Sequence, residues 1–418
     1  KVTRTLGPAQ SPSWSPDGTE IAYIGHAHRR EGVARHNKLW KVAASGGEPV
    51  CLTADLDRNH VSETAPLWSK DGATLSCLVV DAGSTHLYSV PAAGGKPKVA
   101  IGGLRTLSSA HNAGGSIVFT ASDPTHPTEV FLCAENGSRE RVLTTENAAW
   151  LAAVQLAEPE PLKVVNADGL PVQAWVMRPP GARGPIPCLL NVHGGPKSQY
   201  AYTFHDEFQV YAGAGYAVVY GNPRGSDGQT EAFAMSVLHG WGDKDWQDVT
   251  AIADTIGGLS FVDQERVGIM GGSYGGFMTS WAVGHTNRFK AACSERAVNN
   301  FFSMVGTSDI GYWFMVEHVG RPSFADLDAY MRMSPISYAG NIETPLLVLH
   351  SENDLRCPIE QGEQMYVALK LQNKPTEFWR FPEDNHEMSR SGRPRNRLKR
   401  FEVILEWFER WMPAPEAK

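Results

Sequence analysis

The sequence predicts an all-β region followed by an α/β domain with a doubly wound, mostly parallel sheet. Three observations predict this order. Strand-and-turn units repeat within residues 1–155, apolar strands alternate with helix-length segments within residues 156–418, and a glycine-flanked serine, Ser273, follows one of those strands. At 418 residues, 42% of them hydrophobic and 20% charged, the chain is long enough for two domains with separate cores.

The first region repeats two short units. Trp14 precedes a Ser-Pro-Asp-Gly turn and an apolar strand, and Trp68 precedes a Ser-Lys-Asp-Gly turn and a similar strand. A second unit, a strand followed by a glycine turn, begins at Leu39, Leu87 and Val130. Its period of about 43 to 48 residues is typical of a four-stranded propeller blade. The repeats therefore predict about three blades of a β-propeller.

Three blades are fewer than the four to eight with which propellers usually close. We expect residues 1–155 to be a partial β-propeller, truncated from a longer protein. The alternative is an open stack of sheets whose edges are covered by another subunit. Both cases predict association, so we expect a homo-oligomer, and an incomplete propeller leaves open whether the catalytic site is active.

Residues 156–418 read as a catalytic domain with six strands. The strands are separated by helix-length segments, which is typical of a parallel sheet covered on both faces. Residues 397–412 carry apolar side chains at helical spacing and predict a helix packed on the core. The predicted strands are residues 186–192, 215–221, 266–270, 290–294, 345–350 and 376–381.

The motif Gly-Gly-Ser-Tyr-Gly-Gly at residues 271–276 directly follows the third of these strands. A serine on a tight strand-to-helix turn needs residues without a Cβ two places before and two places after it. Gly271 and Gly275 meet this need. The pattern predicts a nucleophile elbow at Ser273, and with it an α/β-hydrolase domain. An ordinary glycine-rich loop is the alternative, because the chain contains 41 glycines.

An acid and a histidine follow in the order that this fold uses, Ser, Asp, His. Asp354 comes one turn after the strand at 345–350, and His386 ends the strand-like run at 376–386. We predict that His386 removes the proton of Ser273 and that Asp354 orients the imidazole. Neighbouring side chains that leave alternatives open are Glu352, Asn353, Glu383 and Asp384.

A tetrahedral oxyanion needs two N–H donors. Tyr274, the residue after the nucleophile, would supply one at the positive end of the following helix. The second is suggested by His-Gly-Gly-Pro at residues 193–196, where a strand breaks and glycines let the backbone approach a substrate. Gly195 is the candidate donor, and a plain turn is the alternative.

Five motifs occur in a specific order. They are His-Gly-Gly-Pro at 193–196, Asn-Pro-Arg-Gly-Ser at 222–226, Gly-Gly-Ser-Tyr-Gly-Gly-Phe-Met at 271–278, Ser-Glu-Asn-Asp at 351–354 and Asn-His at 385–386. Together they resemble the prolyl oligopeptidase family of serine peptidases, and within it most closely the acylaminoacyl-peptidase branch. The resemblance spans about residues 160–412.

This resemblance implies an α/β-hydrolase catalytic domain, peptidase activity on short peptides, no cofactor, and a β-propeller that screens substrates by size. The chain departs from the dipeptidyl-peptidase relatives at one position. Those relatives place an oxyanion-binding tyrosine where this chain has His193. The departure favours the backbone of Gly195 as the second donor.

Two groups of side chains are candidates for substrate binding. An aromatic segment could wall an apolar pocket for the acyl side of the bond, with core packing as the alternative. Its members are Phe301, Phe302, Tyr312 and Trp313. One arginine of a basic cluster after His386, or Arg224, could instead pair with a terminal carboxylate, which would make the enzyme a carboxy-terminal exopeptidase. The cluster consists of Arg390, Arg393, Arg395 and Arg397. A solvated surface is the simpler explanation of that cluster.

Composition excludes several classes of function. The net charge of −7 without long charged runs argues against a nucleic-acid partner, and no apolar stretch approaches the length of a membrane span. The six cysteines are scattered without a Cys-x-x-Cys pair, so we expect no metal and a cytoplasmic protein. A carboxylesterase would use the same triad, but the blade repeats favour a peptidase. A non-enzymatic scaffold would require loss of a triad member.

Overall fold

The computed structural model of the chain describes residues 7–28 and 32–414, and these form two compact units. The first unit holds the described residues up to 155 together with 199–205 and 227–235. The remaining residues, 156–198, 206–226 and 236 onward, form the second unit. Each unit has hydrophobic core clusters of its own.

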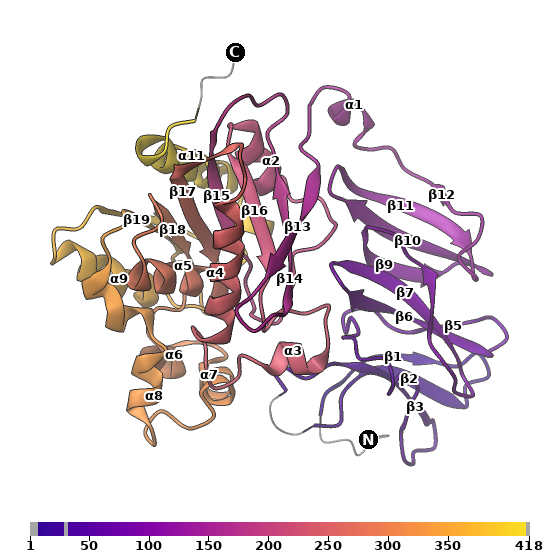
Figure 1. Cartoon of the computed structure of the whole chain (residues 1–418). Helices are drawn as coiled ribbons and strands as arrows, with labels where there is room; N and C mark the ends of the chain where they lie inside the picture. The colour runs from indigo at the N-terminus through magenta and orange to yellow at the C-terminus, as the bar shows by residue number, and fades with distance from the viewer. Residues whose placement is uncertain (1–6, 29–31, 415–418) are drawn as a thin grey trace. The chain divides into compact units, whose positions relative to one another are not determined.

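The first unit consists of antiparallel strands in sets of four (Figure 1). The first set is β1 (Ala9–Trp14), β2 (Glu20–Gly25), β3 (Lys38–Ala43) and β4 (Val50–Cys51). The second is β5 (Leu67–Trp68), β6 (Thr74–Asp81), β7 (Ser84–Pro91) and β8 (Lys98–Ile101). The third is β9 (Thr106–Asn112), β10 (Ser116–Asp123), β11 (His126–Ala134) and β12 (Arg141–Val142), and a single parallel pair, Thr85 with Thr106, joins it to β7.

The repeated turns agree in their hydrogen bonds. Ser15 Oγ donates to Oδ1 of Asp17 at 2.6 Å, and Ser69 Oγ donates to Oδ1 of Asp71 at 2.6 Å. The glycine after each aspartate has a φ of 72° or 71°, a backbone conformation that glycine adopts without strain. The sequence repeat is therefore a repeat of turn chemistry. A short helix, α1 (Ala148–Leu151), follows the last strand of this unit.

The second unit is built on an eight-stranded sheet in the order β13-β14-β16-β15-β17-β18-β19-β20. Six strands are parallel, and β13 and β14 extend the sheet in antiparallel fashion. The bounds are β13 (Pro159–Val165), β14 (Pro171–Met177), β15 (Ile186–Val192), β16 (Ala217–Asn222), β17 (Val262–Gly272), β18 (Ala292–Glu295), β19 (Leu346–Ser351) and β20 (Thr376–Phe381). The prediction of an α/β domain after an all-β region is confirmed.

Helices cover both faces of this sheet (Figure 1). Two residues of β17 that stand three apart point to opposite faces of the sheet. A Cβ on Gly268 would meet Phe408 of α11, whereas one on Gly271 would meet Gly275 of α5. The helices of the second unit are α2 (Asp206–Gly213), α4 (Lys244–Ile256), α5 (Tyr274–His285), α6 (Phe301–Thr307), α7 (Gly311–Val319), α8 (Leu327–Arg332), α9 (Glu360–Lys370), α10 (Met388–Ser391) and α11 (Pro394–Trp411), with a 3₁₀ turn, η1 (Pro335–Asn341).

One short helix, α3 (Glu231–Met235), lies in the second half of the chain but belongs to the first unit. Glu231 explains this, because its carboxylate accepts from Nη1 of Arg35 and from the N–H of His36, both at 2.8 Å. Among the described residues, no helix combines the length and hydropathy that crossing a bilayer requires.

Candidate active site

Ser273 lies in the sharp turn between β17 and α5, at a φ of 63°. A Cβ on Gly271 would come 2.4 Å from the carbonyl oxygen of Val192, and one on Gly275 would come 2.0 Å from the same oxygen. Both positions therefore require glycine, because the turn packs directly on the end of β15. The N–H of Ser273 donates to the carbonyl of Glu295 at 3.0 Å, which ties the turn to β18 on its other side.

The loops after β19 and β20 bring Asp354 and His386 together. Nδ1 of His386 lies 2.7 Å from Oδ2 of Asp354, and the aspartate is buried. The other carboxylate oxygen, Oδ1, accepts from the N–H groups of Arg356 and Cys357, both at 2.9 Å. Asp354 is therefore held by its own loop with one oxygen left for the imidazole.

Cys357 links the loop of the acid to the turn of the serine. Burial raises the pKa of its thiol, and the nearby side chain of Ser273 opposes this shift. The carbonyl of Cys357 accepts from Nε2 of a second buried histidine, His350, at 2.6 Å. The same Nε2 lies 3.6 Å from Oδ2 of Asp354. The side chain of Ser273 thus lies beside the segment that positions Asp354.

Burial lowers the pKa of His386 below its ordinary value, and the hydrogen bond that its Nδ1–H donates to Asp354 opposes this shift. The positive charges of Arg296 and Arg390 lower the pKa further. The imidazole is therefore neutral at neutral pH, which is the state that a general base requires.

The turn after β15 lies against the nucleophile. A Cβ on Gly194 would come 3.4 Å from Cβ and 3.9 Å from Oγ of Ser273. Gly195 has a φ of 126°, which favours glycine. His193 is buried, and its Nε2 lies 2.8 Å from Oγ of Ser226. The backbone of this turn, rather than the histidine side chain, is the part presented next to Ser273.

Tyr274 occupies the first turn of α5, where helix geometry leaves N–H groups without an intrahelical acceptor. Its hydroxyl donates to Oδ2 of Asp245 at 2.7 Å. Oδ1 of Asp245 accepts from the N–H groups of Gly242 and Trp246 at 2.8 and 2.9 Å. Burial raises the pKa of Asp245 to about 6, although these hydrogen bonds oppose the shift. A buried acid therefore anchors the residue after the nucleophile.

The aromatic segment separates into core and surface. Phe301 is fully buried, with its ring centroid 5.3 Å from that of Trp241, so it packs in the core and lines no pocket wall. Phe302, Tyr312 and Trp313 are 46%, 71% and 39% exposed. The segment that carries them is tied to the loop of the acid, since Ser308 Oγ donates to the carbonyl of Arg356 at 2.6 Å.

Arg224 does not fit the role of a carboxylate anchor. Its Nε and Nη2 donate to the buried Asp248 at 3.0 and 2.8 Å, and Nη1 donates to Asp168 at 2.5 Å. The guanidinium is occupied by internal carboxylates and buried, so a substrate cannot pair with it. Arg390 of α10, whose side chain is 56% exposed, pairs with Glu387, the residue directly before this helix.

Sequence reasoning missed several polar residues of the site: Asp245, Arg296, His350 and Cys357. Asp245 had a signal, since Asp245 and Asp248 stand three residues apart in a helix-length segment and so share one face of a helix. The structure shows that both are fully buried. The other three lie at or just after the ends of apolar strands. Within the part of the chain that the structure describes, no group of three or more His, Cys, Asp or Glu side chains could hold a metal ion.

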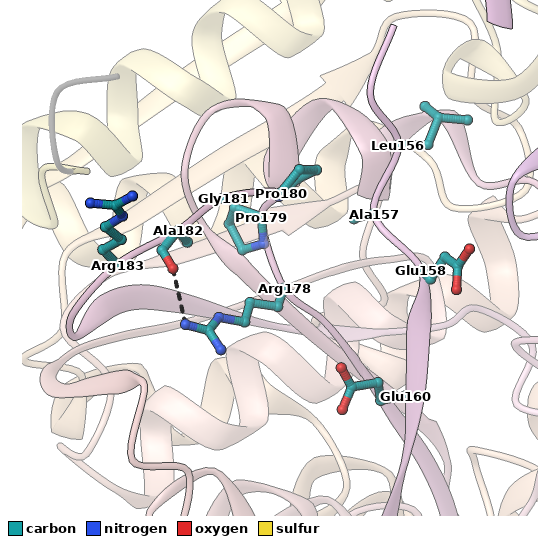
Figure 2. Close-up of a pocket in the computed structure, with 10 residues that line it drawn as sticks. All are labelled: Leu156, Ala157, Glu158, Glu160, Arg178, Pro179, Pro180, Gly181, Ala182 and Arg183. Atoms are coloured by element: carbon teal, nitrogen blue, oxygen red, sulfur yellow. Dashed lines mark hydrogen bonds between the residues drawn. The ribbon is translucent and has the colours of Figure 1, made fainter. Parts of the chain in front are cut away.

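A separate hollow of about 500 Å³ occurs in the second unit (Figure 2). Arg178 and Glu160 lie on its walls, and Nη2 of Arg178 donates to the carbonyl of Ala182 at 3.0 Å. None of its lining residues belongs to the site around Ser273, so we assign it no catalytic part. The lining residues are Leu156, Ala157, Glu158, Glu160 and residues 178–183.

Comparison with known proteins adds three findings. A family model described as the prolyl oligopeptidase family matches residues 202–414. The uncharacterized peptidase YuxL of Bacillus subtilis (strain 168) is 39% identical over 389 residues, which cover 89% of this chain and 59% of that protein. Dipeptidyl-peptidase 5 of Trichophyton equinum is 27% identical over 423 residues, 97% of this chain and 56% of that protein.

Among solved structures, the acylaminoacyl peptidase of Pyrococcus horikoshii matches with a TM-score of 0.87 and 31% sequence identity. The match covers 96% of this chain and 63% of that chain. The present chain therefore spans less than two thirds of the length of these relatives.

Proposed function

Because this chain belongs to the prolyl oligopeptidase family, we propose that it is a serine peptidase that hydrolyses short peptides through an acyl-enzyme. Within the family we favour acylaminoacyl-peptidase or oligopeptidase activity, which the likeness to the Pyrococcus horikoshii acylaminoacyl peptidase supports. The observation that carries the proposal is the 2.7 Å contact between Nδ1 of His386 and Oδ2 of Asp354, on loops of the sheet whose strand β17 leads into the elbow of Ser273.

In the proposed first step, Oγ of Ser273 attacks the carbonyl carbon of the scissile peptide bond. Nε2 of neutral His386 takes the hydroxyl proton as the new C–O bond forms. Asp354 holds the proton on Nδ1 and stabilises the imidazolium that results. The imidazolium then gives its proton to the leaving amine, and the C–N bond breaks.

The oxyanion of the tetrahedral intermediate would accept from the N–H groups of Tyr274 and Gly195. The first is supported by its place at the positive end of α5 and by the anchoring of the Tyr274 hydroxyl on Asp245. The second is supported by the close approach of the preceding residue, Gly194, to Ser273. A water molecule, deprotonated by His386, then releases the acyl group and regenerates the serine.

Three exposed aromatic residues, Phe302, Tyr312 and Trp313, are proposed to contact apolar parts of the substrate. Their exposure and the tie between α6–α7 and the loop of Asp354 support this. An apolar wall suits a blocked amino end, because an acetyl group carries no charge. Arg390 remains a further proposed contact with the substrate.

We also propose a domain organisation, a cellular compartment and an oligomeric state. Three consecutive sets of four strands support a partial β-propeller within residues 1–155, and residues 156–418 would be the catalytic domain. The six cysteines are free thiols, five of them buried, which supports a reducing cytoplasm. Association into a homo-oligomer would cover the exposed edges of the partial propeller.

The direct test is labelling with a fluorophosphonate probe, which reacts with an activated serine. We expect labelling of the wild type and of Ser391→Ala, an exposed serine in α10, and none of Ser273→Ala. Labelling that persists in Ser273→Ala would refute the assignment of the nucleophile.

Product identification then names the subclass. Matched peptides with acetylated, free and amidated ends are digested and the fragments are identified by mass spectrometry. An acylaminoacyl peptidase releases the acetylated first residue, whereas a carboxy-terminal exopeptidase releases the last residue of free-acid peptides. Hydrolysis of simple esters without cleavage of any peptide would favour the carboxylesterase and contradict the proposal.

A further inference from the structure

Arg296 is fixed beside the nucleophile by backbone hydrogen bonds. It is the first residue after β18, and the carbonyl of the preceding Glu295 accepts the N–H of Ser273 at 3.0 Å. Its own N–H donates to the carbonyl of Leu349 in β19 at 2.8 Å. Arg296 adopts a φ of 36°, an uncommon conformation for a residue with a side chain. The backbone thus places this arginine at the carboxyl edge of the sheet, between the strands that carry the serine and the acid.

The guanidinium of Arg296 rests on the elbow itself. A Cβ on Gly272, the residue directly before the nucleophile, would lie 2.7 Å from both Cζ and Nη2 of Arg296. The side chain is only 13% exposed. Its positive charge also contributes to the lowered pKa of His386. The cation therefore belongs to the surroundings of the reacting groups.

Unlike its neighbours, this guanidinium has no hydrogen-bond partner within residues 7–28 and 32–414. Its Nε is buried and unpaired. The nearest carboxylate oxygen, Oε2 of Glu295, is 3.9 Å from Nη1, which is beyond hydrogen-bond distance. Burial lowers the pKa of Arg296, although the negative charge of Glu295 opposes the shift. Burying a charge without hydrogen bonds costs free energy, so a ligand that accepts these hydrogen bonds would stabilise Arg296.

Glu295 cannot supply the missing partner, because Arg400 already holds it. Nε of Arg400 donates to Oε2 of Glu295, and Nη2 donates to Oε1, each at 2.6 Å. Nη2 of Arg400 also pairs with Glu207 at 2.8 Å. Of two neighbouring buried arginines, one is fully paired and the other presents free N–H donors beside the nucleophile.

We propose that the guanidinium of Arg296, lying on Gly272, is an anion subsite that binds a carboxylate of the peptide substrate. This rests on the proposed peptidase function and deepens it. A carboxylate offers two coplanar oxygens that match the paired N–H groups of a guanidinium. The carboxylate comes either from the C-terminus of a peptide or from an Asp or Glu side chain, and the two sources can be distinguished.

The test compares two pairs of peptides that differ in one negative charge each. One pair has a free or an amidated C-terminus, and the other has an internal Glu or Gln near the cleaved bond. We expect the wild type to cleave the charged member of one pair with a kcat/KM roughly 10- to 100-fold higher, the range expected for hydrogen bonds to a charged group. The pair that shows the preference identifies the source of the carboxylate.

Substitution assigns the preference to one residue. Arg296→Met, which keeps much of the side-chain volume, should remove the preference, so that the charged and the neutral peptide of each pair are cleaved with equal kcat/KM. Gly272→Ala, which displaces the guanidinium, should also remove it. Arg288→Met is the matched control, because Arg288 lies before the other end of β18 and pairs with Asp254 at 2.8 Å. An equal loss on charged and neutral peptides in Arg296→Met would overturn the subsite, as would a wild type without preference.

A second readout separates the subsite from the peptidase proposal. The charged and neutral peptides of both pairs compete with the fluorophosphonate probe for Ser273, and this competition requires no turnover. Stronger protection by the charged member of one pair that is lost in Arg296→Met supports the subsite even if no peptide is cleaved, in which case the peptidase proposal alone fails. Equal protection by the charged and neutral members of both pairs contradicts the subsite even if all of them are cleaved.

Discussion

The hydroxyl of Tyr274 donates to Oδ2 of Asp245 at 2.7 Å, so a fully buried carboxylate holds the residue that follows the nucleophile. Tyr274→Phe removes the donor and leaves one buried oxygen unpaired. We expect the free energy of unfolding to fall by about 1–3 kcal/mol, measured by urea denaturation. The backbone N–H stays in place, so kcat should fall only a few-fold. The double variant Tyr274→Phe with Asp245→Asn should recover part of the stability, and simple additivity of the two losses would contradict the coupling.

Asp354→Asn replaces the oxygen that faces Nδ1 of His386 with a group that cannot hold the required tautomer. We expect kcat to fall by roughly 10³- to 10⁴-fold with little change in KM, as for other Ser-His-Asp enzymes. Steady-state kinetics on a cleaved peptide measures this. Asp309→Asn is the control, since its partner Arg356 forms only an exposed ion pair with it at 2.9 Å. Comparable losses in the two variants would argue against the role of Asp354.

The pH profile should report the lowered pKa of His386. Because the base works in its neutral form, kcat/KM should rise with pH through a pKa below the ordinary histidine value of 6.5. Arg390→Gln removes a cation that lowers this pKa, so the acidic limb should move to higher pH, by roughly half a unit. Arg395→Gln, whose arginine pairs with Glu383 at 3.1 Å, is the matched control. A limb that stays in place in Arg390→Gln would rule out this electrostatic effect.

His318 should make the protein sensitive to acid. It is buried, its Nδ1 accepts from Nε1 of Trp241 at 3.0 Å, and burial lowers its pKa to about 3. Below pH 6.5 this histidine is protonated in the unfolded chain but stays neutral in the folded protein. The free energy of unfolding therefore falls as the pH falls toward 3. Between pH 7 and 5 this group alone should cost about 2 kcal/mol.

His318→Gln keeps an acceptor for Trp241 without a titrating group. Its unfolding free energy should therefore decrease less between pH 7 and 5 than that of the wild type. Measurement at pH 7, where the histidine is neutral in both states, isolates the effect of packing. Equal slopes in the two proteins would show that His318 does not cause the acid sensitivity.

The two neighbouring arginines should differ in their contribution to stability. Arg400→Met removes the partner of buried Glu295 and should destabilise by roughly 3–5 kcal/mol. Arg296→Met removes a buried guanidinium whose Nε has no hydrogen bond and whose nearest carboxylate, Glu295, is 3.9 Å away, so the melting temperature should stay the same or rise. Thermal unfolding of both variants checks this. A large drop for Arg296→Met would reveal a structural partner and weaken the case for a subsite.

The parallel strands could be predicted from sequence because they are buried on both faces and appear as continuous apolar runs. Strands β13 and β14 could not, since Pro159 and Pro161 stand in β13 and Pro171 begins β14, and proline argues against a strand within a sheet. The serine elbow could be located from its glycines, because steric limits at Gly271 and Gly275 are local to the chain.

Contacts between side chains that are far apart in the sequence could not be predicted. Phe301 and Phe302 are adjacent, yet one is buried and the other 46% exposed, and only the orientation of α6 decides between them. Arg224 forms an ion pair with Asp248 of α4, which lies 24 residues later in the chain. Arg296 is distinguished by the absence of such a partner among the described residues, a property that depends on Glu295 being held by Arg400.

The distribution of thiols permits a measurement of energy transfer between two dyes without any substitution of the chain. Five of the six cysteines are buried, and Cys51, in β4 of the first unit, is half-buried. A maleimide dye at Cys51, attached at mildly alkaline pH because burial raises the pKa of its thiol, and a dye-bearing fluorophosphonate at Ser273 would mark one unit each. Energy transfer between the dyes would then follow, in real time, any movement of one unit against the other as the solution changes.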